Sequence, residues 1–148
     1  MAFDLKPYQD PLTIQRVLYS AKTVAVLGLS SNHLRPSYFV AFYLKRHGYT
    51  MIPVNPKETE ILGQRSYPSL IDVPEPIDIV DVFRRPEDTP AIADDAVTKG
   101  AKALWLQTGI SSEDAAARAK AGGLMVVMDT CIGATHSLLR IARKAQKV

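Results

Sequence analysis

The stretch from Thr23 to Ser37 limits the possible folds of this chain more than any other part of the sequence. It begins as an apolar run, turns at Gly28 and becomes small and polar, and a helical pattern follows from Tyr38 to His47. An apolar strand, a glycine turn and a helix in this order open the nucleotide site of a doubly wound parallel sheet. Gly28 allows a sharp turn because it has no Cβ atom. We therefore expect a strand up to Gly28 and a ligand-binding loop after it.

This loop combines hydroxyl groups with features that attract anions. Ser30, Ser31 and Ser37 supply the hydroxyls. Pro36 suits the first position of a helix, where a missing N–H is not needed. The helix N-terminus carries partial positive charge and unpaired N–H donors. Arg35 adds a guanidinium whose fork matches a phosphate, so the loop predicts an anion site.

The loop is not the dinucleotide fingerprint G-x-G-x-x-G. Only Gly28 matches that pattern, because Ser30 and His33 occupy the other two glycine positions. The alternative interpretation is an ordinary strand-to-helix loop whose serines cap the helix. The convergence of glycine, three serines, arginine and proline on one loop favours the anion site.

Apolar strands and helical patterns alternate along the whole chain. Strands are expected at residues 22–28, 49–54, 77–83, 103–107 and 124–128, and helices at about 11–20, 38–47, 89–99, 111–121 and from 135 onward. Residues 55–76 are irregular, with a short helical turn within 67–71. This alternation predicts one α/β domain, residues 1–148, with a Rossmann-like, doubly wound parallel sheet. Its five strands should follow the order 3-2-1-4-5, with helices on both faces.

Turn and cap residues mark several helix ends. Asp10 followed by Pro11 predicts a capped helix start. Ser111 and Asp114 predict a capping pair for the helix that ends near residue 121. Gly100 predicts the end of the helix before it.

Composition argues against several classes of protein. The net charge of +3 is too small to indicate a nucleic-acid binder, and the basic cluster of Arg140, Arg143, Lys144 and Lys147 fits a solvated helix end. Cys131 is the single cysteine, so no intramolecular disulfide can form, which fits a reducing compartment. No apolar run approaches the ~18 residues of a membrane span, and no signal peptide is recognisable. We therefore expect a cytoplasmic protein without nucleic-acid or membrane partners.

The residues after each strand matter because ligands of such sheets bind beyond the carboxyl ends of the strands. An NAD-binding sheet usually has a carboxylate after the second strand, which accepts hydrogen bonds from the ribose hydroxyls. This chain has Asn55 there, followed by Pro56 and Lys57. An amide with a nearby lysine favours a ligand that carries a phosphate on its ribose, such as NADP or coenzyme A. The alternative is that Lys57 is a solvated loop residue.

Asp81 stands inside the third expected strand, which should be covered on both faces. A carboxylate in such a place needs a partner. Arg84 and Arg85 follow the strand directly and are the candidates.

Five short motifs follow one another along the chain: Gly28-Leu29-Ser30 with Arg35-Pro36-Ser37, Pro53-Val54-Asn55-Pro56, Asp81-Val82-Phe83-Arg84-Arg85-Pro86, Trp105-Leu106-Gln107-Thr108-Gly109 and Met128-Asp129-Thr130-Cys131-Ile132. Together they resemble the stand-alone CoA-binding domain proteins, a bacterial and archaeal family similar to the N-terminal domain of the succinyl-CoA synthetase α subunit. The resemblance covers roughly residues 21–139. It implies a Rossmann-like fold that binds coenzyme A across the loops after the strands.

The resemblance also implies roles for the residues that would hold the phosphates. Ser30, Arg35 and Ser37 would hold the pyrophosphate of coenzyme A. Lys57 would meet the phosphate on its ribose.

For the rest of the ligand, the resemblance implies that Val82, Phe83 and Arg84 line the adenine and pantetheine path. Gln107 and Gly109 would lie farther along it. The complete expected site is Gly28, Ser30, Ser31, Arg35, Pro36, Ser37, Asn55, Pro56, Lys57, Val82, Phe83, Arg84, Gln107 and Gly109.

The histidines and the cysteine give little indication of catalysis. His47 lies on the apolar stripe of a helix and is expected to be structural, and His33 lies in the loop after the first strand. Cys131 and His136 are a candidate nucleophile pair, but no oxyanion donor or third member is evident. One cysteine and three separated histidines lack the spacing of a metal site.

Two functions of different classes remain. The first is a coenzyme A binding protein without evident catalysis of its own, acting as a carrier, a sensor or the partner of an acyl-CoA enzyme. The alternative is a minimal NADP-binding oxidoreductase. The chain has no substrate domain and no Tyr-x-x-x-Lys pattern, which favours the first.

Overall fold

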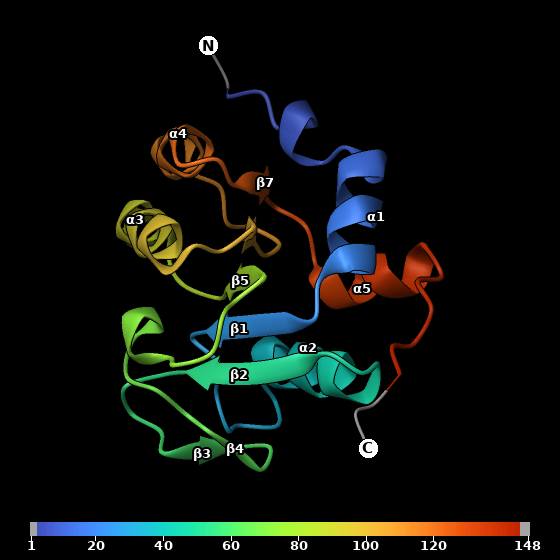
Figure 1. The fold of residues 1–148 in the computed structure, drawn as a ribbon, viewed down its shortest axis with the longest axis vertical. Helices are drawn as coiled ribbons and strands as arrows, with labels where there is room; N and C mark the ends of the chain where they lie inside the picture. The colour runs from blue at the N-terminus through green and yellow to red at the C-terminus, as the bar shows by residue number, and fades with distance from the viewer. Residues whose placement is uncertain (1–2, 146–148) are drawn as a thin grey trace.

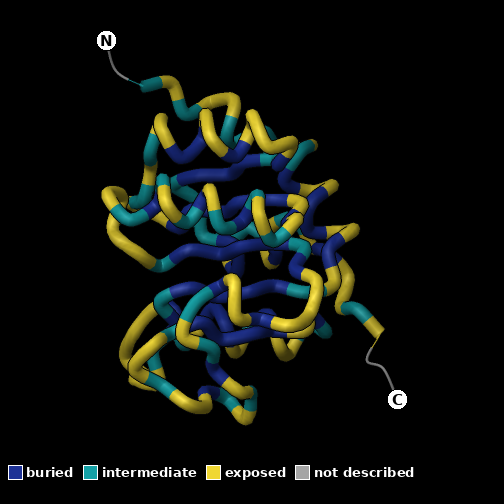
Figure 2. Tube along the Cα trace, turned by 60° about the vertical axis from the view of Figure 1, so that its left-hand side comes forward, coloured by how far each residue is buried: buried dark blue, intermediate teal, exposed yellow. Residues whose placement is uncertain are grey.

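Five parallel strands form the central sheet of the computed structural model, which describes residues 3–145 (Figure 1). They are β1 (Thr23–Leu27), β2 (Thr50–Val54), β5 (Ile79–Val82), β6 (Ala103–Leu106) and β7 (Met125–Val127). In space their order is β2-β1-β5-β6-β7, and every neighbouring pair is parallel. The strands are buried along almost their whole length (Figure 2). The Rossmann-like α/β fold expected from the sequence is confirmed.

The expected 3-2-1-4-5 pattern is present, but its third strand is not the expected one. The outer place beside β2 is taken by a single parallel bridge between Val54 and Tyr67. Here Tyr67 N donates to Pro53 O (3.1 Å) and Asn55 N donates to Tyr67 O (2.9 Å). With the bridge counted as strand three, the sheet follows the pattern, and β7 is a sixth strand at the far edge. The expected third strand, β5, pairs with β1 instead, because a one-residue bridge leaves no apolar run in the sequence.

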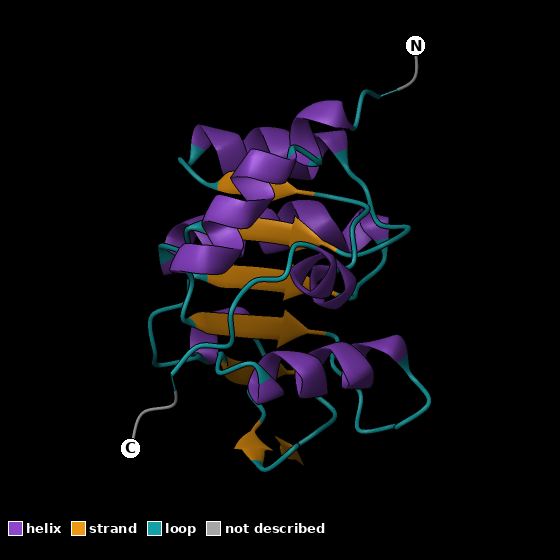
Figure 3. Cartoon of the chain, turned by 90° about the vertical axis from the view of Figure 1, so that its right-hand side faces the viewer, coloured by secondary structure: helices purple, strands orange, loops and turns teal. Residues whose placement is uncertain are grey.

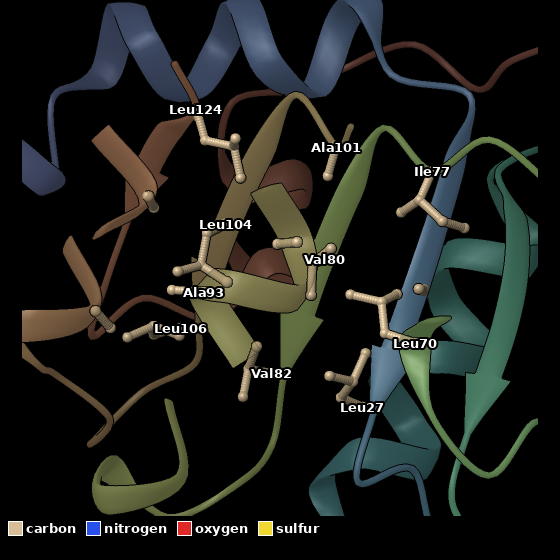
Figure 4. Packing of buried hydrophobic residues seen from close by; sticks show 14 of the residues in the cluster. Leu27, Leu70, Ile77, Val80, Val82, Ala93, Ala101, Leu104, Leu106 and Leu124 are labelled. Carbon is tan, nitrogen blue, oxygen red and sulfur yellow. The ribbon is translucent and has the colours of Figure 1, made fainter. Parts of the chain in front are cut away.

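Helices cover both faces of the sheet. They are α1 (Pro11–Ser20), α2 (Pro36–Arg46), α3 (Thr89–Lys99), α4 (Glu113–Ala121) and α5 (Ile132–Leu138). α3 and α4 pack on one face against residues such as Val80 and Leu104 (Figure 4). α1, α2 and α5 pack on the other face, against Ile79 and Trp105. Alternate residues of each strand therefore belong to two separate cores. No helix in residues 3–145 has the length and apolar character needed to cross a membrane.

The irregular segment between β2 and β5 contains a small hairpin and one helical turn. β3 (Glu60–Ile61) and β4 (Gln64–Arg65) form the antiparallel hairpin. The turn is η2 (Leu70–Asp72), which overlaps the expected position at 67–71. Two further single turns are η1 (Lys6–Tyr8), before α1, and η3 (Pro86–Asp88), before α3.

Two helix ends are confirmed and a third is shifted by one residue. Asp10 Oδ2 accepts from a backbone N–H in the first turn of α1 (3.1 Å), and Gly100 ends α3 with a φ of 75°. α4 is capped by Ser112, whose Oγ accepts from the third residue of the helix (3.1 Å). The expected pair, Ser111 with Asp114, is therefore wrong by one position. Two adjacent serines make the pattern ambiguous, and only the backbone decides which of them takes the extended cap conformation.

The last helix begins and ends earlier than the sequence indicated. α5 starts before residue 135, and Arg140, just beyond it, has a left-handed φ of 55°. The chain then turns back, so that Lys144 N donates to His47 O (2.9 Å). Gly48 permits this approach, because a Cβ atom there would lie 2.4 Å from the carbonyl oxygen of Lys144. The basic residues Arg140, Arg143 and Lys144 thus follow the helix, and Lys147 lies outside the described residues.

Asp81, in β5, is fully buried, and neither carboxyl oxygen has a hydrogen-bond partner among the described residues. The expected partners do not serve it, because Arg84 and Arg85 both pair with Asp88 (3.2 and 3.5 Å). Burial raises the pKa of Asp81 well above its ordinary value. Burial without an ion-pair partner therefore favours the protonated, neutral form of this carboxyl.

Candidate functional site

Three loops that follow neighbouring strands meet at one cavity on the edge where the strands end. The arrowheads in Figure 3 mark this C-terminal edge. Gly28 comes from the loop after β1, Pro56 from the loop after β2 and Arg84 from the loop after β5. The cavity has a volume of about 350 Å³, and its remaining walls come mainly from the segment at η2, from η3 and from α3. The fold thus forms a hollow where ligands of doubly wound sheets bind.

Gly28 holds the three loops close together. Its N–H donates to the carbonyl oxygen of Val54 at the end of β2 (3.0 Å). Its φ is +81°, and a Cβ atom would lie only 2.4 Å from the carbonyl oxygen of Phe83. Any larger residue would therefore push the loop after β5 away from the loop after β1.

The loop after β1 is ordered by its own polar side chains. Ser37 Oγ accepts from Ser30 N (3.2 Å), and Ser30 Oγ accepts from Asn32 N (3.0 Å). Ser31 Oγ donates to Glu58 Oε1 (2.7 Å), which connects this loop to the one after β2. Ser37 is buried in the first turn of α2. The serines therefore fix the shape of the loop, and the hydroxyl hydrogens of Ser30 and Ser37 are left to donate elsewhere.

Arg35 supplies a free positive charge at the start of α2. It precedes Pro36, the first residue of the helix, and no side chain caps this N-terminus. Within residues 3–145 its exposed guanidinium forms no hydrogen bond or ion pair. A cation and unpaired helix donors at one point can together bind an anion.

Asn55 explains why no carboxylate follows β2. Its Nδ2 donates to the carbonyl oxygen of Leu29 (2.8 Å), and its Oδ1 accepts from Lys57 N (2.9 Å). A carboxylate could accept but not donate, so an amide is needed to join the two loops. The side chain of Lys57 is exposed at the rim of this edge.

Arg84, Asp88 at the end of η3 and Asp95 of α3 form the charged wall of the cavity. Arg84 Nη2 lies 3.2 Å from Asp88 Oδ2. Burial raises the pKa of Asp88, but hydrogen bonds from Arg84 and Arg85 outweigh burial and lower it overall. Farther along α3, burial and the nearby Asp94 raise the pKa of Asp95. The wall thus offers both donors and acceptors.

The other expected residues lie apart from this cavity. Val82 is fully buried in the core, so only its backbone faces the edge, and Phe83 is half-buried. Gln107 is buried, and its Oε1 accepts from Ile132 N (3.1 Å). Gly109 N donates to Asp129 Oδ1 (2.6 Å). Gln107 and Gly109 therefore brace the loops after β6 and β7, and Gln107 connects them to the first residue of α5.

The candidate nucleophile pair is not assembled. His136 is buried and shares its Nδ1 with the hydroxyl of Tyr43 (2.7 Å), and no hydrogen bond joins it to Cys131 in the described part of the chain. Burial, together with the nearby His47 and Lys144, lowers the pKa of His136 to about 4. No group of three or more potential metal ligands is found in residues 3–145. Tyr43, Tyr49, His47 and His136 instead form a cluster of stacked and edge-on rings.

Sequence reasoning missed the cavity residues that lie at η2, in η3 and in α3. Among them are Ser69, just before η2, Asp88 of η3, and Ile92 and Asp95 of α3. A signal was present for α3, because a helix that begins soon after the end of β5 must start at the same edge of the sheet. None was available for η2, since its place depends on how the irregular segment folds.

Comparison with known proteins gives the family. A family model described as "CoA binding domain" matches residues 22–137. The chain is 39% identical to the uncharacterized protein YneT of Bacillus subtilis over 127 residues, which are 86% of this chain and 94% of that one. It is 34% identical to a solved hypothetical protein from Pyrococcus horikoshii, with a TM-score of 0.88 over 95% of this chain and 99% of the other.

A second kind of relative is much longer. The chain is 32% identical over 101 residues to an ADP-forming acetate–CoA ligase of Archaeoglobus fulgidus. The matched region is 66% of this chain but only 15% of the ligase. The same domain thus occurs both in small proteins and as one part of large enzymes. On the family match, which takes in most of its length, this chain belongs to the CoA-binding domain family.

Proposed function

We propose that this protein binds coenzyme A across the C-terminal edge of its sheet and has no chemistry of its own. The observation that carries the proposal is the meeting of three loops at one cavity, through Gly28, Pro56 and Arg84, in a chain of the CoA-binding domain family. It would then act as a carrier or sensor of coenzyme A, or as the partner of an acyl-CoA enzyme.

The phosphates bind along the loop after β1 in this proposal. The free guanidinium of Arg35 and the start of α2 take the pyrophosphate, together with the hydroxyl donors of Ser30 and Ser37. Lys57, exposed at the neighbouring loop, takes the ribose phosphate. The phosphates of the ligand would thus pair with the exposed Arg35 and Lys57. Such exposed pairs avoid the large desolvation cost of a buried ion pair.

The adenine and the pantetheine arm occupy the remaining parts of the edge in this proposal. The cavity beside Gly28 and Arg84 is the place for the adenine, because it is a hollow formed by several loops and offers both donors and acceptors. From there the pantetheine arm passes the backbone of Val82 and Phe83 toward Gln107 and Gly109. The proposal includes no catalysis, because the Nδ1 of His136 bonds to Tyr43 and no hydrogen bond joins His136 to Cys131 among the described residues.

Isothermal titration of the purified protein with coenzyme A, NADPH and NADH tests this proposal. We expect coenzyme A to bind and NADH not to bind, because Asn55 braces two loops where a carboxylate would hold the ribose. NADPH shares the ribose phosphate and is the decisive competitor. Tight binding of NADPH with no signal for coenzyme A would favour the oxidoreductase and contradict our proposal.

A further inference from the structure

A second cavity, of about 620 Å³, lies between α2 and α5 and shares no lining residue with the first. Its α2 side is formed by aromatic side chains, among them Phe39, Phe42 and Tyr43. Its α5 side is formed by the small residues Gly133 and Ala134. The groove is therefore apolar on both sides.

The sequence explains why this groove stays open. Gly133 is buried, and a Cβ atom there would lie 3.7 Å from Tyr43 and 3.8 Å from Val40, which are ordinary contact distances, so a side chain longer than alanine would enter the groove. The next residue, Ala134, is exposed and too short to fill the space in front of Phe39. Small residues thus leave a gap that larger ones on α5 would close.

Two aromatic side chains beside the groove remain in contact with solvent. Phe39 is 64% exposed and Phe42 is 46% exposed. Large exposed apolar residues that line a groove indicate a ligand or a partner, whereas scattered ones do not. Burial of these rings would be favourable for any apolar occupant.

The groove begins at the edge where the proposed coenzyme A site ends. α2 starts directly after the loop that holds Arg35, and α5 starts directly after the loop that follows β7 (Figure 1). Cys131, the residue before α5, lines the groove. The backbone N–H of the next residue, Ile132, donates a hydrogen bond to Gln107 Oε1 (3.1 Å). Gln107 is the far end of the proposed pantetheine path. A group attached to the thiol of coenzyme A would therefore arrive at the mouth of the groove.

We propose that the groove between α2 and α5 binds the acyl chain of an acyl-CoA thioester, so that the ligand is an acyl-CoA with a medium-length apolar chain. This inference rests on the proposed function. The groove follows α2 from Phe39 to Arg46, a rise of about 10 Å. Arg46 and His47 make its far end polar, which limits the length of chain that gains from burial.

Titration with coenzyme A, acetyl-CoA, butanoyl-CoA and octanoyl-CoA tests the inference. Affinity should rise with chain length, by up to about fourfold for each methylene that the groove buries fully. Because the groove is open on one side, we expect a total gain of about tenfold or more from acetyl-CoA to octanoyl-CoA. The measured quantity is the ratio of these two dissociation constants.

Two matched variants locate the effect. Ala134→Leu places a larger side chain in the groove at an exposed helical position, and it should reduce the ratio to near one. Ala117→Leu makes the same change at an exposed position of α4, which lies on the opposite face of the sheet, and it should leave the ratio unchanged. Both positions tolerate leucine, a strong helix former.

The outcomes separate this inference from the proposed function. Equal binding of coenzyme A and every acyl-CoA would overturn the groove inference and leave the proposed function standing. If the native protein binds neither coenzyme A nor any acyl-CoA, both the groove inference and the proposed function are wrong. A chain-length effect that persists in Ala134→Leu would contradict the location. If sedimentation shows a dimer that Ala134→Leu dissociates, with no chain-length effect, the groove binds a second copy of the protein instead.

Discussion

Arg35 is the residue whose charge the proposed site uses most directly. Its guanidinium is exposed at the start of α2 and has no partner among the described residues. We expect Arg35→Ala to weaken coenzyme A binding by about 1.5–3 kcal/mol, the range for a hydrogen bond to a charged group. The loss should shrink as salt rises, because part of it is screened charge. Titration at low and high salt measures both effects.

Arg16→Ala is the control for this prediction. Arg16 is also exposed, but it lies on α1, away from the three loops. Its removal changes the net charge by the same amount and should leave the affinity almost unchanged. Equal losses in the two variants would mean that Arg35 acts only through the overall charge of the protein.

Lys57 is expected to act through one phosphate of the ligand. Coenzyme A should bind more tightly than dephospho-coenzyme A to the native protein, and the difference should narrow in Lys57→Ala. This comparison is a double-mutant cycle with one change in the ligand, so it isolates the pairwise term. An exposed pair is worth ~0.2–1 kcal/mol. An unchanged difference would remove Lys57 from the site.

Asp81 links stability to pH, because the fold favours the protonated form of its carboxyl. Its pKa is higher in the folded protein than in the unfolded chain, so protonation of Asp81 stabilises the fold. This stabilisation is fully present at pH values below the unfolded pKa, and it is lost as the pH rises through the folded pKa. We expect Asp81→Val to raise the free energy of unfolding by about 1–3 kcal/mol at pH 8, since an unsatisfied buried group is removed. The gain should be smaller near pH 4.

Urea unfolding of both proteins at pH 4, 6 and 8 checks this expectation. A variant that is less stable than the native protein at pH 8 would show that the carboxyl has a favourable role in the fold. Asp81→Asn keeps the shape but cannot ionise, and its stability should depend less on pH than that of the native protein.

At the scale of elements, the junction of the three loops depends on Gly28. Gly28→Ala would combine a left-handed φ of +81° with a contact of 2.4 Å to the Phe83 carbonyl. Gly123→Ala shares the first problem, with a φ of +85°, but has open space around it. Conformational strain alone costs about 1–2 kcal/mol. Gly28→Ala should therefore destabilise the fold more than Gly123→Ala, and only Gly28→Ala should weaken coenzyme A binding.

Thermal unfolding and titration of both glycine variants measure these effects. Equal losses of stability would show that the loop after β5 moves aside without strain. Unchanged affinity in Gly28→Ala would show that the ligand does not depend on this junction.

The elements that could be predicted are those with a long periodic signal. β1 and α1 follow directly from apolar runs and caps, and each boundary lies within a residue or two of its expected place. The bridge at Tyr67 and the cap at Ser112 could not be predicted, because each depends on a choice among neighbouring residues that tertiary packing makes. The early end of α5 depends on the return of Lys144 to Gly48, a contact between distant parts of the chain.

The same distinction holds for the candidate site. Sequence order was enough to predict that Gly28, Pro56 and Arg84 lie at one edge, because parallel strands end together. It did not indicate that Ser37 and Asn55 also act as internal braces. Such roles follow from which loops touch, and a single sequence does not contain that information.

At the scale of the whole molecule, the residues that stabilise the fold lie apart from those of the proposed coenzyme A site. The two cores lie on the faces of the sheet, and the loops after β1, β2 and β5 gather at one edge. The acetate–CoA ligase of Archaeoglobus fulgidus contains a region similar to this chain as only 15% of its length. A domain that binds coenzyme A while other domains carry out the chemistry is consistent with our proposal.

The central claim is that coenzyme A binds across the C-terminal edge of the sheet, and amide chemical shifts measured during a titration test it most directly. With coenzyme A added to isotope-labelled protein, the signals of Gly28, Ser31 and Lys57 should move in proportion to saturation. The signals of Lys22 and Lys102, which stand just before β1 and β6 at the opposite edge, should stay in place. Shifts confined to the opposite edge, or no shifts at saturating coenzyme A, would contradict the account.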